Sequence, residues 1–184
     1  MAQAFDRVWH KGLTYRLTQY LPKQYFQILE SYITDRYFKV KQEEAYLELK
    51  KIRAGELQGS VLDPALYLLY TCDIPTIEIG TIATFADDTA ILAVGETIKD
   101  TTGKPQTSVN KIYEWTRKWR IKLNKIKSGD VDFTNKNVQH LPVILNNKKL
   151  PYSNSDKYLG ITLDAKLMLK KKKNWKYNTK KCIA

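Results

Sequence analysis

Two adjacent aspartates, Asp87 and Asp88, are the residues whose type and spacing best suit catalytic chemistry in this sequence. They lie between two apolar, β-rich runs, residues 77–84 and 89–94, so we expect them at the tip of a strand–turn–strand hairpin. Like charges this close repel each other, and neither flank supplies a Lys or Arg to compensate. A divalent cation would relieve the repulsion, and two-metal phosphoryl-transfer sites are built on such carboxylates. A solvated turn is the simpler interpretation of the dipeptide alone, because Asp is a common turn residue.

The elements around this hairpin alternate between helices and antiparallel strands. Apolar residues at helical spacing predict two helices within residues 13–33, which Pro22 separates because a proline breaks helical hydrogen bonding. Alternating residues predict a hairpin, Tyr37–Lys41 with Tyr46–Lys50, that has one solvent face. Further along, we expect a helix with Ser60 as N-cap, an amphipathic helix over Gln106–Asn124, and short strands at Val131–Phe133, Val143–Leu145 and Lys157–Leu163. This pattern predicts an α+β fold, with one antiparallel sheet and helices packed on one face.

Charge is unevenly distributed along the 184 residues. The formal net charge is +12, but residues 1–102 carry −3 and residues 103–184 carry +15. A strongly basic second half favours a polyanionic partner, and it has no long apolar face that would insert into a membrane, so we expect nucleic acid. Cys72 and Cys182 are too few for a disulfide framework, which favours an intracellular, reducing environment. His10 and His140 have no clustered partners in the sequence, so neither is predicted to bind a metal.

Four short motifs occur in a fixed order that resembles a known family. They are Ala4-Phe5-Asp6-Arg7-Val8-Trp9-His10, Gln58-Gly59-Ser60-Val61-Leu62 with Pro64, Phe85-Ala86-Asp87-Asp88-Thr89-Ala90, and Tyr158-Leu159-Gly160-Ile161-Thr162-Leu163-Asp164. Together they resemble the palm of a reverse transcriptase from a non-LTR retrotransposon, of the jockey-like elements of animals. The resemblance covers nearly the whole chain, and four motifs in register are far more specific than any one of them.

The resemblance implies an RNA-directed DNA polymerase that binds an RNA template, a DNA primer and deoxynucleoside triphosphates. A primer 3′-hydroxyl would attack the α-phosphate of the incoming nucleotide, with two Mg²⁺ ions, or Mn²⁺ as a substitute, stabilising the attacking and leaving oxygens. Asp87 and Asp88 are then the catalytic, metal-binding carboxylates. Strand alternation turns Asp88 away from its neighbour, so its contact with a metal is the less direct of the two.

Further site residues follow from the resemblance. They are Phe5, Gln58 and Lys127 for the nucleotide, Gly59, Ser60, Leu159 and Gly160 for template and primer, and Lys118, Arg120 and Lys122 as a basic patch for nucleic acid. Each has a simpler structural interpretation: Phe5 as a core aromatic, the 58–60 loop as an ordinary helix start, and the lysines as a solvated helix face.

The sequence also departs from the family pattern. The first metal-binding aspartate, four residues before the Ala-Phe-Asp motif, would fall immediately before Met1, and Asp6 does not take its place. Asp63 stands where the family usually has glycine and would put a negative charge beside the template. We therefore expect a palm at residues 1–165, lacking the fingers, followed by a Lys-rich start of the thumb at 166–184. This chain alone is predicted to be inactive; the alternative is a non-catalytic basic protein that binds nucleic acid. The sequence leaves the oligomeric state open.

Overall fold

The computed structural model describes residues 7–55, 60–76, 80–95, 98–134 and 140–167, which form two compact units. The helical unit comprises the described residues of 3–73 together with 119–121. The hairpin unit comprises those of 74–118 and 122–167. Each unit is described by itself.

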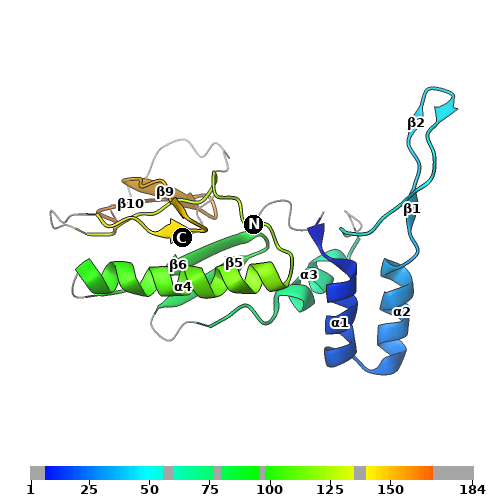
Figure 1. The fold of residues 1–184 in the computed structure, drawn as a ribbon, viewed down its shortest axis with the longest axis horizontal. Coiled ribbons are helices and arrows are strands. Elements are labelled where there is room, and N and C mark those ends of the chain that lie inside the picture. Colours follow the sequence, from blue (N-terminus) through cyan, green and yellow to red (C-terminus); the bar gives the residue numbers. More distant parts are fainter. Residues whose placement is uncertain (1–6, 56–59, 77–79, 96–97, 135–139, 168–184) are drawn as a thin grey trace. The chain divides into compact units, whose positions relative to one another are not determined.

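The helical unit is built on three helices and a long hairpin arm. Its elements are α1 (His10–Tyr20), α2 (Lys23–Ile33), β1 (Tyr37–Phe38), β2 (Lys41–Gln42), β3 (Ala45–Tyr46), β4 (Lys50–Lys51) and α3 (Asp63–Thr71). α1 contacts both α2 and α3, and α1 lies beside α2 in Figure 1. As predicted, α1 and α2 are separated at Pro22, which is the N-cap residue of α2.

The core of the helical unit lies between α1, α3 and the short segment at Trp119. Leu13 and Leu17 of α1 are fully buried, as are Leu66 and Tyr70 of α3. Trp119 is also buried, and its ring meets the Tyr70 ring edge-on, with centroids 5.7 Å apart. These apolar contacts join α3 to Trp119, which lies far from α3 in the sequence.

The hairpin arm forms as predicted, but its exposure differs from the prediction. β1 pairs with β4 and β2 with β3, so the chain turns at Glu43 and Glu44. Tyr37 and Phe38 are consecutive strand residues and therefore point to opposite faces. Both are exposed, so the arm has solvent on both faces, and the prediction of one solvent face is wrong.

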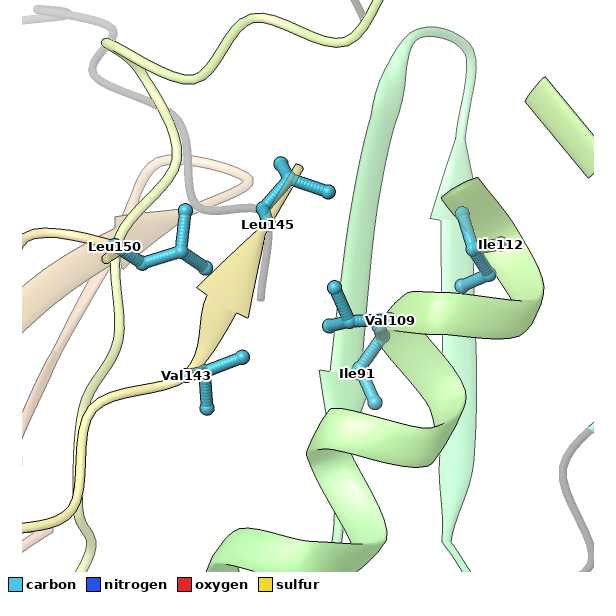
Figure 2. Close-up of a cluster of buried hydrophobic side chains, with 6 residues drawn as sticks. All are labelled: Ile91, Val109, Ile112, Val143, Leu145 and Leu150. Atoms are coloured by element: carbon cyan, nitrogen blue, oxygen red, sulfur yellow. The ribbon is translucent and has the colours of Figure 1, made fainter. Parts of the chain in front are cut away.

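The hairpin unit combines one long helix with three antiparallel hairpins. Its elements are β5 (Thr81–Phe85), β6 (Asp88–Leu92), α4 (Ile98–Lys118), β7 (Ile144–Leu145), β8 (Lys148–Lys149), β9 (Ser155–Tyr158) and β10 (Ile161–Asp164). α4 contacts β6 and β7 and runs alongside the β5–β6 hairpin in Figure 1. Figure 2 shows the cluster that joins these elements, formed by Ile91, Val109, Ile112, Val143, Leu145 and Leu150.

Several predicted boundaries are wrong. The helix predicted over Gln106–Asn124 runs from Ile98 to Lys118, with Pro105 inside it. A proline inside a helix removes one hydrogen bond and crowds the preceding turn, so α4 continues across Pro105 against this local preference. The helix ends earlier than predicted because Arg120 adopts a left-handed φ of +55°, which interrupts helical geometry.

The fold class is mixed α and β, as predicted, but not with a single sheet. The described residues form five separate two-stranded antiparallel sheets. The strand predicted at Val131–Phe133 is absent, and the one predicted over Lys157–Leu163 is divided between β9 and β10 by a turn. Within the described part of the chain, no helix is both long and apolar enough to span a bilayer.

Candidate functional site

The paired aspartates lie at the tip of the β5–β6 hairpin, as the sequence predicts. β5 and β6 pair antiparallel up to Phe85↔Asp88, so Ala86 and Asp87 alone make the turn. Ala86 has a φ of +49°. A residue with a Cβ adopts this left-handed conformation at a cost of about 1–2 kcal/mol. The turn therefore holds its conformation against a local preference, with Asp87 inside it and Asp88 beginning β6.

The two carboxylates have different environments. Asp87 is partly exposed, whereas Asp88 is only 8% exposed. Because side chains alternate across a strand, Asp88 lies on the face opposite to Ile91, which packs in the core of the hairpin unit. Phe85, the cross-strand partner of Asp88, is 63% exposed. Asp87 is thus the carboxylate that a ligand reaches most easily.

Tyr158, on β9, lies close to Asp88, although the sequence analysis assigned it no role. Burial raises the pKa of the Tyr158 hydroxyl, and the negative charge of Asp88 raises it further. The structure therefore brings two of the sequence motifs together, the one containing Asp87-Asp88 and the one beginning at Tyr158. The sequence showed two separate motifs, and their spacing along the chain gave no indication that they are in contact.

Leu159 and Gly160 form the two-residue turn between β9 and β10, where the residue pattern predicts a continuous strand. Tyr158 pairs with Ile161 across it. The φ values of Leu159 and Gly160 are +48° and +85°, the signs that a type I′ turn requires at both central residues. Glycine adopts such values without strain, whereas leucine does not. Leu159 is 50% exposed, so this turn presents a strained apolar residue to solvent.

Ser60 precedes α3, but it is not the N-cap residue that the sequence predicts. The N-cap residue is Leu62, and its side chain makes no capping hydrogen bond. Ser60 instead exchanges two hydrogen bonds with the helix start: its hydroxyl accepts from the Leu62 N–H at 3.2 Å, and its own N–H donates to the Asp63 carboxylate at 3.2 Å. Asp63 is buried, and its carboxylate accepts from the Ser60 N–H at the helix start; its expected position beside the template stays a prediction.

Lys127 is exposed in a turn of the hairpin unit. Its N–H donates to the Asn124 carbonyl at 3.1 Å and lies 3.3 Å from the Asn124 side-chain oxygen, so the backbone is fixed while the ammonium group is in solvent. Three other predicted residues, Phe5, Gln58 and Gly59, lie outside the described residues.

The predicted basic patch is divided between the two units. Lys118 and Lys122 are exposed residues of the hairpin unit, whereas Arg120 belongs to the helical unit. The Arg120 guanidinium lies over the Trp9 ring, 4.2 Å from the ring centroid, which is within the roughly 6 Å of a cation–π contact. Arg120 therefore has a structural contact in addition to its predicted role.

His140 has acidic neighbours that the sequence analysis did not identify. Its Nδ1 lies 2.7 Å from an Asp132 carboxylate oxygen and its Nε2 lies 3.5 Å from Asp130. Its ring also stacks on Tyr152, with centroids 3.9 Å apart. Asp130 accepts the Val143 N–H at 3.1 Å, so this cluster joins three segments of the hairpin unit. The eight-residue separation of Asp132 and His140 gave no periodic signal for it.

Comparison with known proteins places these features in a family. The family model for reverse transcriptase (RNA-dependent DNA polymerase) matches residues 1–163. The chain belongs to the reverse transcriptase family. This match includes the Asp87-Asp88 hairpin and the turn at Leu159, and it confirms the resemblance inferred from the motifs.

Individual relatives agree with this assignment. The chain is 38% identical over 173 residues to the RNA-directed DNA polymerase from mobile element jockey of Drosophila melanogaster, which covers 90% of this chain and 19% of that protein. It is 38% identical over 174 residues to the probable RNA-directed DNA polymerase from transposon X-element of the same species, covering 92% and 19%. The probable RNA-directed DNA polymerase from transposon BS is 36% identical over 177 residues, covering 91% of this chain and 20% of that protein. The chain thus spans about a fifth of the length of these relatives.

Reverse transcriptases generally use divalent metal ions. The oxygen atoms of Asp87 and Asp88 are the donors that a hard divalent cation prefers. Their number does not complete a site, however, because the described residues contain no group of three His, Cys, Asp or Glu side chains that could hold a metal ion. Among the described residues, Asp87 and Asp88 therefore supply the donor chemistry for such an ion but not a group of three ligands.

Proposed function

We propose that this chain is the palm of an RNA-directed DNA polymerase, over residues 1–165, followed by the start of the thumb at 166–184. The polymerase would extend a DNA primer along an RNA template with deoxynucleoside triphosphates. One observation carries the proposal: within a reverse transcriptase family match, Asp87 occupies a two-residue hairpin turn and is more exposed than the buried Asp88 beside it. A palm needs an accessible carboxylate at such a tip, because it must reach a nucleotide and a metal together.

Asp87 and Asp88 are the carboxylates that this chain would contribute to a site for Mg²⁺, or for Mn²⁺ in its place. The difference in exposure assigns them different parts. Asp87 would bind the ion directly, whereas the buried Asp88, close to Tyr158, would hold the hairpin tip against the β9–β10 hairpin. When bound, the metal would supply Lewis-acid stabilisation of phosphate oxygens.

The turn at Leu159 and Gly160 would contact the primer. The observation that supports this contact is that Leu159 is both strained and half-exposed. Strained residues persist mainly where the surrounding structure or function requires them. The remaining contacts would come from Phe5, Gln58 and Lys127 to the nucleotide, from Gly59 and Ser60 to the template, and from Lys118, Arg120 and Lys122 to the nucleic-acid backbone.

The test is metal-dependent binding of a template–primer. A fluorescent RNA template annealed to a DNA primer is titrated with the chain in Mg²⁺ and in EDTA, with a complementary deoxynucleotide present, and binding is followed by anisotropy. We expect Mg²⁺ to tighten binding by the wild-type chain and to have no such effect on Asp87→Asn. Asp35→Asn is the matched control, because Asp35 is an exposed aspartate whose described partner is Lys51. It should keep the wild-type response to Mg²⁺.

Binding that is identical in Mg²⁺ and EDTA, and identical in Asp87→Asn, would overturn the proposal. It would favour the non-catalytic, basic nucleic-acid-binding protein instead. Primer extension by the wild-type chain, measured in the same samples, would show in addition that the carboxylates present here suffice for turnover.

A further inference from the structure

The hairpin arm of the helical unit exposes side chains along its whole length. Every residue from Tyr37 to Lys51 is exposed, and within the described part of the chain the strands of the arm pair only with one another. Figure 1 shows the arm extending past the end of α2. Its large exposed apolar side chains are Tyr37, Phe38, Val40, Tyr46, Leu47 and Leu49. Apolar side chains gathered at a surface mark a site of interaction.

The arm has two faces, and one of them combines tyrosines with lysines. Cross-strand partners share a face, and side chains alternate along a strand. Tyr37 pairs with Lys51 across the arm. Lys41, four positions after Tyr37, lies on the same face and pairs with Tyr46. Lys39 lies between Tyr37 and Lys41 on that face, and we call these five residues the tyrosine–lysine face.

The opposite face of the arm is mainly apolar. Phe38 and Val40 alternate with the residues of the tyrosine–lysine face along the same strand, so they point the other way. Leu47 follows Tyr46 and lies opposite Val40, whose carbonyl accepts the Leu47 N–H at 3.0 Å. The ring of Phe38 is 46% exposed, so each face of the arm presents an aromatic ring to solvent.

Contacts between side chains agree with this assignment of faces. The Lys39 ammonium lies 4.4 Å from the centroid of the Tyr46 ring, and the Lys41 ammonium lies 5.6 Å from it. The Lys51 ammonium lies 5.7 Å from the centroid of the Tyr37 ring. The two tyrosines are nevertheless 50% and 57% exposed. The tyrosine–lysine face therefore presents accessible aromatic rings with cations beside them.

The arm is basic although the half of the chain that contains it is not. Residues 36–53 include six Lys or Arg and three Glu, a net charge of +3, whereas residues 1–102 together carry −3. Lys51 also forms an ion pair with Asp35 at 2.7 Å, so the other two lysines of the face are the better placed to meet an anion. The charge of the arm thus complements a polyanion.

Aromatic rings with adjacent cations suit a single-stranded nucleic acid. Any base stacks on an exposed ring, and basic residues along the strand neutralise its phosphates. A stacked base contributes more than an exposed cation–π contact, so a base can displace an ammonium group from the ring and leave it to meet a phosphate. A duplex does not offer the same contact, because its bases are already stacked on one another.

We propose that the tyrosine–lysine face of the hairpin arm binds single-stranded RNA. Bases stack on Tyr37 and Tyr46, and phosphates contact Lys39 and Lys41. The stacking and the charge carry the choice of a single strand, whereas the choice of RNA rests on the proposed function. The site is separate from the paired aspartates, and binding at it needs no metal ion.

The test measures binding of a fluorescent single-stranded RNA, about 12 nucleotides long, to the full chain. Anisotropy is followed in EDTA, without primer or deoxynucleotide, so the result does not depend on the proposed metal site. Tyr37→Leu and Tyr46→Leu remove the two rings, and Tyr46→Phe keeps the ring without its hydroxyl. Phe38→Leu is the matched control, because it removes a similarly exposed ring from the opposite face of the same arm.

We expect Tyr37→Leu and Tyr46→Leu each to weaken binding by about fivefold or more, which is the lower end of the effect of losing one stacked base. Tyr46→Phe and Phe38→Leu should stay within about twofold of wild type, because neither removes a ring from the tyrosine–lysine face. An RNA duplex of the same sequence should bind wild type and the tyrosine variants alike.

The lysines are tested through the dependence of binding on salt. Each phosphate contact that is lost from a single strand lowers the slope of log affinity against log salt concentration by about 0.7. Lys39→Gln should show this decrease. Lys23→Gln is the control, because Lys23 is an exposed lysine of α2, outside the arm, and it should keep the wild-type slope.

Four results would overturn the inference. The wild-type chain binds no single-stranded RNA in EDTA. The two tyrosine-to-leucine variants bind as wild type does. Phe38→Leu weakens binding as much as Tyr37→Leu, which would show that the fold of the arm matters and not one face. Single-stranded DNA of the same sequence binds more tightly than the RNA, which would overturn the choice of RNA.

Sedimentation of the same samples distinguishes a protein partner. A wild-type dimer that Phe38→Leu dissociates, with RNA binding unchanged in every arm variant, would make the arm an interface between copies of the chain and would also overturn the inference. Loss of the Mg²⁺ effect on template–primer binding would count against the proposed function alone, because the arm is tested without metal or primer.

Discussion

The hydroxyl of Tyr70 offers a sharp test of how the helical unit is held together. Tyr70 is 1% exposed, and its O–H donates to the carbonyl of the buried Trp119. The Tyr70→Phe substitution keeps the ring and its edge-on contact with Trp119, and it removes only the donor. Because the Trp119 carbonyl then loses its partner, we expect the free energy of unfolding to fall by about 1–2 kcal/mol at neutral pH.

The same hydroxyl predicts how this cost varies with pH. Burial raises the pKa of Tyr70 to about 12, from an ordinary value of 10.0, with weaker opposing effects from a backbone hydrogen bond and from Arg120 and Arg16. The folded state therefore favours the neutral phenol. Its contribution to stability is complete below pH 10 and is lost as the pH rises towards 12. By about pH 12 the wild-type chain should lose about 2 kcal/mol of its free energy of unfolding in this way. Tyr70→Phe has no phenol to ionise at this position, so it should not show this loss.

Urea unfolding followed by tryptophan fluorescence measures both effects. At about pH 8 the variant should be less stable than wild type, and by about pH 11 the difference should have narrowed clearly. Tyr25→Phe is the control, since Tyr25 is an exposed tyrosine of α2, and it should match wild type at both pH values. A difference between Tyr70→Phe and wild type that is absent at pH 8, or constant with pH, would refute the reasoning.

Three further predictions concern other parts of the two units. Arg16→Met should lower the free energy of unfolding by about 1–3 kcal/mol in urea titrations, because it breaks the ion pair of the buried Arg16 with the partly exposed Asp73. If the effects of Arg16→Met and Asp73→Asn on the free energy of unfolding simply add in the double variant, the two residues are not paired. Burial raises the pKa of the Asp130 carboxyl above its ordinary 3.8, so wild type should lose stability relative to Asp130→Asn as the pH rises above about 4. A stability difference between the two that does not change with pH would contradict this. Leu159→Asn should raise the free energy of unfolding by about 1 kcal/mol, because asparagine tolerates a positive φ. The same variant should weaken template–primer binding; unchanged binding would show that Leu159 does not contact the primer.

Features that depend on neighbouring residues were predictable from the sequence. The break between α1 and α2 follows from Pro22, and the β5–β6 hairpin follows from two β-rich runs around the paired aspartates. The family itself followed from four short motifs in a fixed order. These signals are local, because backbone geometry and side-chain alternation operate over a few residues.

Other features required the tertiary structure. The burial of Asp88 beside Tyr158 and the contact of His10 with Gly55 both join groups from segments that are far apart along the chain. A periodic pattern reports which side of an element is apolar, but not which distant segment will cover it. The motifs alone therefore identified the candidate catalytic carboxylates, whereas the environment of each carboxylate was decided only by folding, because it depends on contacts between residues far apart in sequence.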